Sequence, residues 1–243
     1  MTEGITFRIE KTFAGRGGSF VFRAAGCLAR GRVSGCCGPS GSGKTTLLRS
    51  IAGLERPEAG EIRFAGRTWF SSADRRWVPP WKRSAALVFQ DYPLLPHLSV
   101  LDNARYGAAD RESAEEALEL VGLVGLGAKR PRELSGGQRQ RAALAGALAA
   151  RPEVLLLDEP FNALDEELRS RLVDDVGGLL ARLGITALLV SHFKADLDRL
   201  CESVRSIADL EAAYFDMRPL GEAAMAAVPP RARRGMPWQP MRA

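Results

Sequence analysis

Apolar positions alternate at the start of the chain, which predicts an antiparallel hairpin. Ile5, Phe7 and Ile9 fall on one face of an extended segment, and Phe20 and Phe22 repeat this period beyond a glycine-rich break. Four more elements are expected in this half of the chain: a strand of small and polar residues at 33–37, a helix at 44–52, a second hairpin at 60–70, and a short buried strand at 85–89. These patterns predict an antiparallel sheet beside a strand that leads directly into a helix.

The second half of the chain alternates helical periodicity with short continuous apolar runs. The run at 154–160 is interpreted as a continuous apolar strand buried on both faces of a parallel sheet, with two carboxylates at its C-terminal end. The other elements expected here are helices at 113–121, 135–150 and 166–183, a buried strand at 185–190, a helix ending at 200, and an edge strand at 204–207. The order of elements predicts an α/β fold with a mostly parallel sheet.

Three stretches lack a regular pattern. Residues 71–84 read as a loop, and Trp77 and Trp81 within it, with Trp69 before it, indicate either an interface or a small local core. Residues 91–101, rich in proline and leucine, are expected to be irregular. The proline-rich, basic end of the chain at 211–243 is expected to be a tail that is partly disordered.

Composition limits the classes of protein that this chain can form. Its 243 residues, 46% of them hydrophobic, suffice for one large α/β domain with a smaller appendage or for two modest domains. A formal net charge of +5 does not by itself imply nucleic acid. The four cysteines show no metal-ligand spacing, which predicts free thiols in a reducing cytosol. Neither a signal peptide nor a membrane span is recognisable, so we expect any membrane association to come through a partner.

One stretch fits the phosphate-binding pattern G-x-x-x-x-G-K-[ST] at every fixed position: Gly38-Pro39-Ser40-Gly41-Ser42-Gly43-Lys44-Thr45-Thr46. Its glycines allow backbone N–H groups to point inward around an anion at the start of the following helix. We expect Lys44 to reach the β- and γ-phosphates of a nucleotide and the Thr45 hydroxyl to bind Mg²⁺. The plainer alternative is a glycine-rich turn between a strand and a helix. Phe13, beside the first turn, could stack on an adenine ring or simply pack.

Further polar motifs occur at the ends of predicted elements. They are Gln90 after the strand at 85–89, Leu134-Ser135-Gly136-Gly137-Gln138 at a helix start, Asp158-Glu159 at the end of the apolar run, Asp165 in Ala-Leu-Asp, and His192 after the strand at 185–190. Ser135 is a suitable N-cap for its helix. In this order, and together with the phosphate-binding pattern, the motifs resemble those of the ATPase subunits of ABC transporters over residues 5–192.

This resemblance implies a fold and a division into domains. The fold would be a P-loop NTPase of the RecA-like type, with a mostly parallel core sheet, an N-terminal antiparallel β subdomain and an inserted α-helical subdomain. The ATPase domain would occupy residues 1–210, with the core and β subdomain at 1–90 and 151–210 and the helical signature subdomain at 91–150. The tail would follow at 211–243. ATP and Mg²⁺ are the implied cofactors.

The resemblance also implies residue roles. Asp158 would bind Mg²⁺, Glu159 would polarise the attacking water, and His192 would contact the γ-phosphate and keep Glu159 in register. Without the resemblance, Glu159 could cap the next turn and His192 could be an ordinary core or surface residue. The implied catalytic residues are Lys44, Gln90, Glu159 and His192, and the implied metal ligands are Thr45, Gln90 and Asp158.

A head-to-tail dimer follows from the same resemblance. The amides of Ser135, Gly136 and Gly137, with Gln138, would form an anion site at a helix N-terminus and close over a nucleotide held by a second copy. Asp165 would lie near the facing loop across that interface. Two ATP molecules would then be sandwiched between two chains.

The expected partner is a separate transmembrane permease at the cytoplasmic face of the inner membrane. Residues 92–100 resemble the family's docking surface for that permease, and the ATPase itself is not expected to contact the cargo. The motifs look most like those of molybdate-type oxyanion importers, with thiamine, iron and polyamine importers as alternatives. A soluble ABC protein acting on nucleic acid or ribosomes is the rival from another class, although nucleic acid is not the expected partner.

Overall fold

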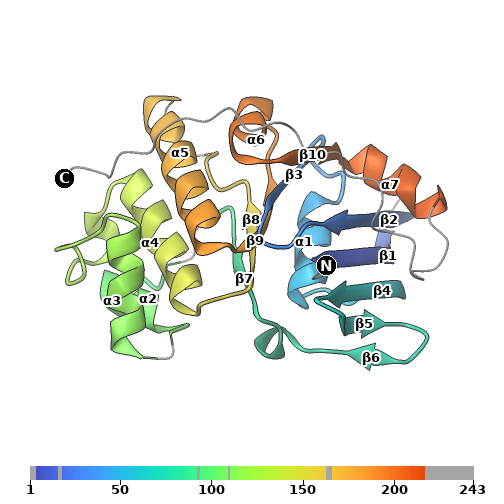
Figure 1. Ribbon diagram of the computed structural model, residues 1–243, viewed down its shortest axis with the longest axis horizontal. Coiled ribbons are helices and arrows are strands. Elements are labelled where there is room, and N and C mark those ends of the chain that lie inside the picture. The colour runs from blue at the N-terminus through green and yellow to red at the C-terminus, as the bar shows by residue number, and fades with distance from the viewer. Residues whose placement is uncertain (1–3, 16–17, 92–93, 109, 163–165, 217–243) are drawn as a thin grey trace.

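The computed structural model describes residues 4–15, 18–91, 94–108, 110–162 and 166–216. Two sheets of five strands share the fold, and helix α1 (Lys44–Ala52) lies between them, with further helices on the outer side of one sheet (Figure 1). The predicted α/β fold is therefore confirmed.

The first sheet is antiparallel and contains the predicted hairpins. Its strands are β1 (Ile5–Gly15), β2 (Gly18–Leu28), β4 (Ala59–Phe64), β5 (Arg67–Ser71) and β6 (Arg76–Trp77), in the order β2-β1-β4-β5-β6. Ile5, Phe7 and Ile9 are fully buried in the core that this sheet shares with α1. The alternating apolar positions thus mark the face of β1 that packs on the helix.

The second sheet is parallel and forms the centre of the molecule. Its strands are β3 (Val33–Cys37), β7 (Ala85–Val88), β8 (Val154–Asp158), β9 (Thr186–Val190) and β10 (Ser203–Ser206), in the order β10-β3-β9-β8-β7. All residues of β8 and β9 are buried. β7 differs from the prediction, because it lies at the edge of the sheet and three of its four residues are only half-buried.

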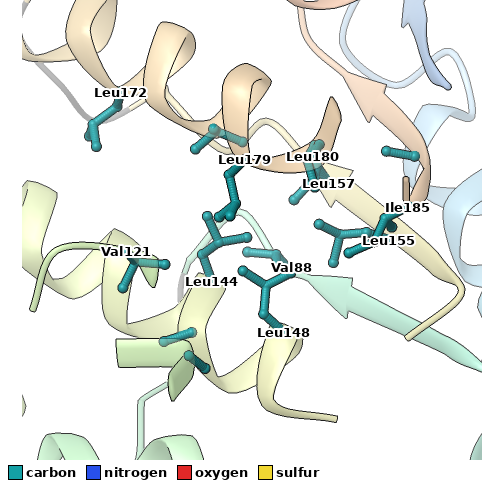
Figure 2. Packing of buried hydrophobic residues seen from close by; sticks show 14 of the residues in the cluster. Val88, Val121, Leu144, Leu148, Leu155, Leu157, Leu172, Leu179, Leu180 and Ile185 are labelled. Atoms are coloured by element: carbon teal, nitrogen blue, oxygen red, sulfur yellow. The ribbon is translucent and has the colours of Figure 1, made fainter. Parts of the chain in front are cut away.

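Helices cover the outer face of the parallel sheet. The helices on this side are α2 (Val100–Arg105), α3 (Arg111–Leu120), α4 (Gly136–Ala149), α5 (Glu166–Leu183) and α6 (Lys194–Leu200). The last helix, α7 (Ile207–Asp216), packs on β2 instead, and the 3-10 turns are η1 (Pro80–Lys82) and η2 (Pro131–Glu133). Figure 2 shows Leu155 and Leu157 of β8 packed against α4 and α5. Val154 and Leu156 face the opposite way, toward α1. A strand with a core on each side needs a continuous apolar run, which explains the sequence of β8.

Helix α2 was not predicted, because residues 91–101 were expected to be irregular. Its first residues are held by the chain that follows α3, since the Val100 and Leu101 amides donate to the carbonyl oxygens of Lys129 and Gly127. The Asn103 side chain also bonds to the backbone of Leu95 at 2.6 and 3.1 Å. Contacts with distant residues therefore stabilise a helix too short to show a periodic pattern.

Strand β3 is built from small residues because α6 packs closely against it. A Cβ atom at Gly35 would lie 3.0 Å from the Cys201 sulfur and 3.1 Å from a methyl of Leu197. A branched residue at this position would displace the helix. The small residues of β3 have a low propensity for strands, but its packing against α6 requires them.

The tryptophans in and before the predicted loop have different environments. Trp69 is buried and Trp77 half-buried, and their rings lie 5.5 and 4.7 Å from the guanidinium carbon of the buried Arg83. Trp81, on η1, is 81% exposed. Two rings therefore form a small local core, and the third lies on the surface.

Helix α7 continues past residue 210, where the sequence analysis ended the ATPase domain. Tyr214 of this helix is buried, and the Arg8 guanidinium lies 4.0 Å from the centre of its ring. The helix packs on β2, so the ordered domain reaches at least residue 216. Most of the predicted tail lies outside the described residues. Within them, no helix has the length and apolar content needed to cross a membrane.

Candidate functional site

The phosphate-binding pattern forms a loop between β3 and α1. Gly41 and Gly43 have φ angles of 77° and 96°, in the left-handed region that favours glycine. A Cβ atom at Gly43 would also lie 2.3 Å from the ring of Phe22, so a side chain has no room there. The loop thus brings its amides to the N-terminus of α1, the end of a helix that attracts anions.

A hollow of about 400 Å³ opens beside this loop. It is lined by Phe13, Phe20, Ser40, Gly41, Gly43, Lys44, Thr45, Thr46, Gln90 and Glu159. Residues from the first hairpin, the phosphate loop and the ends of two parallel strands therefore converge on one space. Phe20 is the member that sequence analysis did not assign to the site.

Phe20 lies directly opposite Phe13 on the paired strand of the hairpin. The side chains are 54% and 36% exposed, so two aromatic rings border the mouth of the hollow. Phe20 could have been found from the sequence, because it lies as many residues after the glycine-rich turn as Phe13 lies before it. Residues paired across a hairpin share a face of the sheet.

Lys44 is buried although it carries a charge. Its ammonium donates hydrogen bonds to the carbonyl oxygens of Gly38 and Pro39, both at 2.9 Å, and lies 3.9 Å from a Glu159 oxygen. Only 6% of the residue is exposed. The loop therefore holds the lysine against its own carbonyls, at the floor of the hollow.

Thr45 and Asp158 meet at the junction of α1 and β8. The Thr45 hydroxyl donates to Asp158 Oδ2 at 2.9 Å, and burial raises the pKa of this carboxyl. Hydroxyl and carboxylate oxygens are ligands suited to Mg²⁺, which commonly takes one or two protein ligands and completes its shell with phosphate and water. In the described part of the chain, no three His, Cys, Asp or Glu side chains cluster as a metal site would require. The Thr45 and Asp158 oxygens are thus the two protein ligands that a phosphate-bound Mg²⁺ could use.

Glu159 and His192 form a second contact at the same edge of the sheet. His192 Nδ1 lies 2.7 Å from Glu159 Oε2, and the Glu159 side chain is 12% exposed. The backbone of Glu159 has a φ angle of 47°, and its N–H donates to the carbonyl of Val190 at the end of β9. A non-glycine residue in this conformation costs on the order of 1 kcal/mol, a strain that is common at functional sites. The sheet thus fixes this carboxylate beside the phosphate loop.

The Ser135 motif lies elsewhere. Ser135 caps α4, and its hydroxyl accepts from the Gln138 amide at 3.3 Å while the Gln138 side chain accepts from the Ser135 amide at 3.0 Å. Gly136 is exposed, with no atom near the place of a Cβ. Side chains of α4 pack on one face of the parallel sheet and those of α1 on the other. Hence a single chain does not bring this motif to the hollow.

Two other predicted residues have simpler outcomes. Gln90 follows β7, is exposed, and lies at the rim of the hollow. Asp165 lies outside the described residues.

Comparison with known proteins gives one family and many relatives. The family model described as "ABC transporter" matches residues 23–162. The chain is 50% identical over 163 residues to "Fe(3+) ions import ATP-binding protein FbpC" of Agrobacterium fabrum, which is 64% of this chain and 44% of that protein. It is 46% identical over 189 residues to "Sulfate/thiosulfate import ATP-binding protein CysA 2" of Chromobacterium violaceum, 75% of this chain and 48% of that protein. The chain thus spans less than half the length of these relatives.

A solved structure extends the comparison to the fold. The "Dimeric structure of a post-hydrolysis state of the ATP-binding cassette MJ0796 bound to ADP and Pi" matches with a TM-score of 0.68 and 26% identity. The match covers 83% of this chain and 93% of that one. Both sheets and the helical layer therefore have a counterpart in a nucleotide-binding cassette.

Proposed function

Because the chain belongs to the ABC transporter family, we propose that it binds ATP with Mg²⁺ and hydrolyses it to power import of a small solute through a separate permease. The observation that carries this proposal is the contact between Glu159 and His192 beside the phosphate loop. It provides a carboxylate base, held by a second side chain, next to the place where a γ-phosphate would lie.

Binding of the triphosphate begins at the loop and Lys44. The amides around Gly41 and Gly43 and the N-terminus of α1 attract the phosphates. Lys44 would exchange the Gly38 and Pro39 carbonyls for β- and γ-phosphate oxygens, to which a short movement of its flexible stem gives access. Phe13 and Phe20 offer ring faces for the adenine at the mouth of the hollow.

The metal would be held by Thr45 and Asp158, with Gln90 approaching from the rim. When bound, Mg²⁺ would neutralise charge on the β- and γ-phosphates. Thr45 would turn its hydroxyl hydrogen away from Asp158, so that both oxygens present lone pairs. Glu159, held apart by its own backbone conformation, remains available for the reacting water.

Hydrolysis requires a water aligned with the bond to the leaving ADP. As the water oxygen bonds to the γ-phosphorus, Glu159 accepts the water proton, and the bond between that phosphorus and the bridging oxygen of ADP breaks. His192 keeps Glu159 oriented through the 2.7 Å contact. The products are ADP and inorganic phosphate.

The substitution Glu159→Gln tests this assignment. We expect the variant to bind ATP with an affinity within a few-fold of wild type and to lose kcat by about 100-fold or more, because an amide cannot accept the proton. Steady-state phosphate release and equilibrium binding of a fluorescent ATP analogue measure the two quantities. Glu119→Gln, on the exposed face of α3, is the matched control and should behave as wild type. A Glu159→Gln variant with wild-type kcat would remove Glu159 as the base.

A groove of about 340 Å³ supports a permease as the partner. Small side chains of α4 border it, and Leu94 and Leu95 of the predicted docking stretch lie on its rim; residues 92 and 93 lie outside the described part. The lining consists of Ala86, Leu87, Val88, Phe89, Leu94, Leu95, Asn103, Tyr106, Gly107, Ala142, Ala143, Gly146 and Ala147. An apolar groove between a sheet edge and a helix suits a short helix of another protein. We infer that it receives a cytoplasmic helix of the permease, which places the chain at the cytoplasmic face of the membrane.

For the cargo, we propose molybdate or a related oxyanion, with iron, thiamine and polyamines as alternatives. The similarity to a sulfate/thiosulfate import protein supports an oxyanion, and the similarity to an iron import protein supports the first alternative. The complex isolated with its permease and solute-binding protein should show ATPase stimulation by the true cargo. Stimulation by iron and not by molybdate would overturn the oxyanion assignment.

A non-transport ABC protein acting on nucleic acid or ribosomes is the competing function. The apolar groove favours a protein partner. Recovery of the full chain with an integral membrane protein would support transport, whereas recovery with ribosomes or nucleic acid would support the competing function.

A further inference from the structure

Helix α6 begins at an unusual residue. Phe193 occupies its N-cap position and provides no side-chain hydrogen bond to the helix. Serine, threonine, aspartate and asparagine are preferred there, and their loss costs about 0.5–2 kcal/mol. Instead, the Phe193 amide donates to the Ser191 hydroxyl at 3.0 Å. A residue that departs from the N-cap preference, with no other side chain capping the helix in its place, commonly has a functional role.

The Phe193 ring packs on the ring of His192. The two ring centres are 4.0 Å apart, with a tilt of 38°. His192 is 42% exposed, so few other contacts restrict its rotation, and its Nδ1 lies 2.7 Å from Glu159. The aromatic contact thus limits the orientations available to an otherwise mobile imidazole.

The Phe193 ring also contacts a cation from α5. The guanidinium carbon of Arg169, on α5, lies 3.9 Å from the centre of this ring, a distance at which a cation and an aromatic face attract each other. Arg169 has at least one further interaction besides this contact. The phenyl ring is therefore held between α5 and the imidazole.

Helices α5 and α6 form a firm support for this stack. At the other end of α6, Arg199 donates to the Ser170 hydroxyl at 2.7 Å and to Asp174 at 2.5 Å, both on α5. Contacts at the two ends of α6 thus join this helix to α5, which lies beside it (Figure 1).

We propose that Phe193 is a positioning residue for ATP hydrolysis: clamped by Arg169, its ring holds the His192 imidazole against Glu159. This inference rests on the proposed function, because it assigns Phe193 a role through His192 and Glu159. It adds to that function a series of contacts that runs from Arg169 on α5 through Phe193 and His192 to the catalytic base. Phe193 itself does not line the hollow.

The test is a set of substitutions in the full chain. Phe193→Leu keeps an apolar side chain without the aromatic face, and we expect kcat to fall about 10-fold while KM for ATP changes less than about 2-fold. Phe193→Tyr keeps the ring and should retain wild-type kcat. Arg169→Met should lower kcat by a smaller factor. Lys194→Ala, at the next, exposed position, is the control. Thermal unfolding should place every variant near wild type.

A double-mutant cycle shows whether Phe193 acts through His192. In a His192→Ala background, Phe193→Leu should change the residual kcat by less than about 2-fold, because the group it positions is gone. The same fold loss in both backgrounds, or wild-type kcat in Phe193→Leu, would overturn the inference. If Phe193→Leu fails to fold, Arg169→Met replaces it in the double-mutant cycle with His192→Ala. An equal fold loss of kcat from Arg169→Met in the wild-type and His192→Ala backgrounds would then overturn the inference.

The two proposals can fail separately. A wild-type chain that does not hydrolyse ATP would overturn the proposed function, whereas a His192→Ala variant with wild-type kcat would overturn the positioning role. An active wild type, an inactive His192→Ala and a fully active Phe193→Leu would overturn the positioning role alone.

Discussion

Among single residues, Asp158 shows a conflict between function and stability. Its carboxylate is buried at the end of β8, and burial raises its pKa, so the charged form destabilises the nucleotide-free fold. We predict that Asp158→Asn raises the free energy of unfolding at pH 7 by on the order of 1 kcal/mol, because the amide can still accept from Thr45 without a charge. This corresponds to about 2–4 °C in Tm for a chain of this size.

This stability gain should depend on pH. The pKa of Asp158 is higher in the folded chain than in the unfolded chain. Between these two pKa values the folded chain binds more protons than the unfolded chain, so the free energy of unfolding of the wild type falls as pH rises through that window. The advantage of Asp158→Asn should therefore grow as pH rises through that window and vanish below about pH 4, the usual pKa of aspartate. Thermal unfolding in buffer with a chelator measures it, with the exposed Asp91→Asn as control. Equal Tm values at pH 7 would contradict the prediction.

Residues differ in how far the sequence alone could place them. Lys44 and Thr45 were predictable because their spacing from the glycines along the chain fixes them at the start of α1. Phe20 and Phe193 were not assigned, because their positions depend on the pairing of two strands and on the start of a short helix. The contact between Glu159 and His192 required the order of strands in the parallel sheet, in which β8 and β9 are neighbours.

At the level of elements, the phosphate-loop helix depends on one buried side chain. The Arg83 guanidinium donates to the carbonyl oxygens of Ser50 and Ile51, in the last turn of α1, at 2.8 and 2.7 Å. A further bond joins it to the carbonyl of Val78 at 2.8 Å, and burial lowers the pKa of Arg83 to about 10. Arg83 thus caps α1 and ties it to the chain that follows the antiparallel sheet.

We predict that Arg83→Met lowers the free energy of unfolding by about 2–4 kcal/mol, because it leaves several buried carbonyl oxygens without a donor. The midpoint of urea unfolding measures the effect. Lys82→Met, at an exposed neighbouring position, removes a positive charge without touching α1 and should unfold at the wild-type midpoint. An Arg83→Met variant with that same midpoint would show that solvent replaces the lost donors.

Elements were predictable where the periodic pattern is long. Helix α5 was predicted with its observed bounds, because eighteen helical residues leave little ambiguity. Strand β8 begins where its continuous apolar run was predicted to begin, although the predicted run reached residue 160 and the strand ends at Asp158. Helix α2 was missed because six residues carry too little pattern, and its stability comes from the Lys129 and Gly127 carbonyls. The role of Arg83 was hidden for a related reason: the carbonyl oxygens that it binds are invisible in a sequence.

Considered as a whole molecule, the chain provides only part of the site that its motifs imply. The hollow is lined by Lys44, Thr45 and Glu159, whereas none of the residues of the Ser135 helix start lines it. The similar MJ0796 structure is described as dimeric and bound to ADP and Pi. We infer that the Ser135 motif completes the hollow of a second copy.

This assembly predicts that the ATPase rate rises more than linearly with protein concentration in dilute solution, since only the dimer has complete sites. Phosphate release per chain, measured over a wide range of chain concentrations, should increase and then level off. A rate per chain that stays constant down to the most dilute samples, while the protein is shown to be monomeric by sedimentation, would contradict the dimeric site.

Mixing two inactive variants tests the head-to-tail arrangement directly. Lys44→Ala should disable the phosphate loop, and Ser135→Arg should block the helix start that closes over the partner's nucleotide. In a mixed dimer the intact loop of the Ser135→Arg chain faces the intact Ser135 motif of the Lys44→Ala chain, so one complete site forms. An equal mixture should therefore recover about a quarter of the wild-type rate, since about half of the dimers are mixed and each has one of two sites. If the whole site lay within one chain, the mixture would recover no ATPase activity, because the second chain could not supply the residue that each variant lacks.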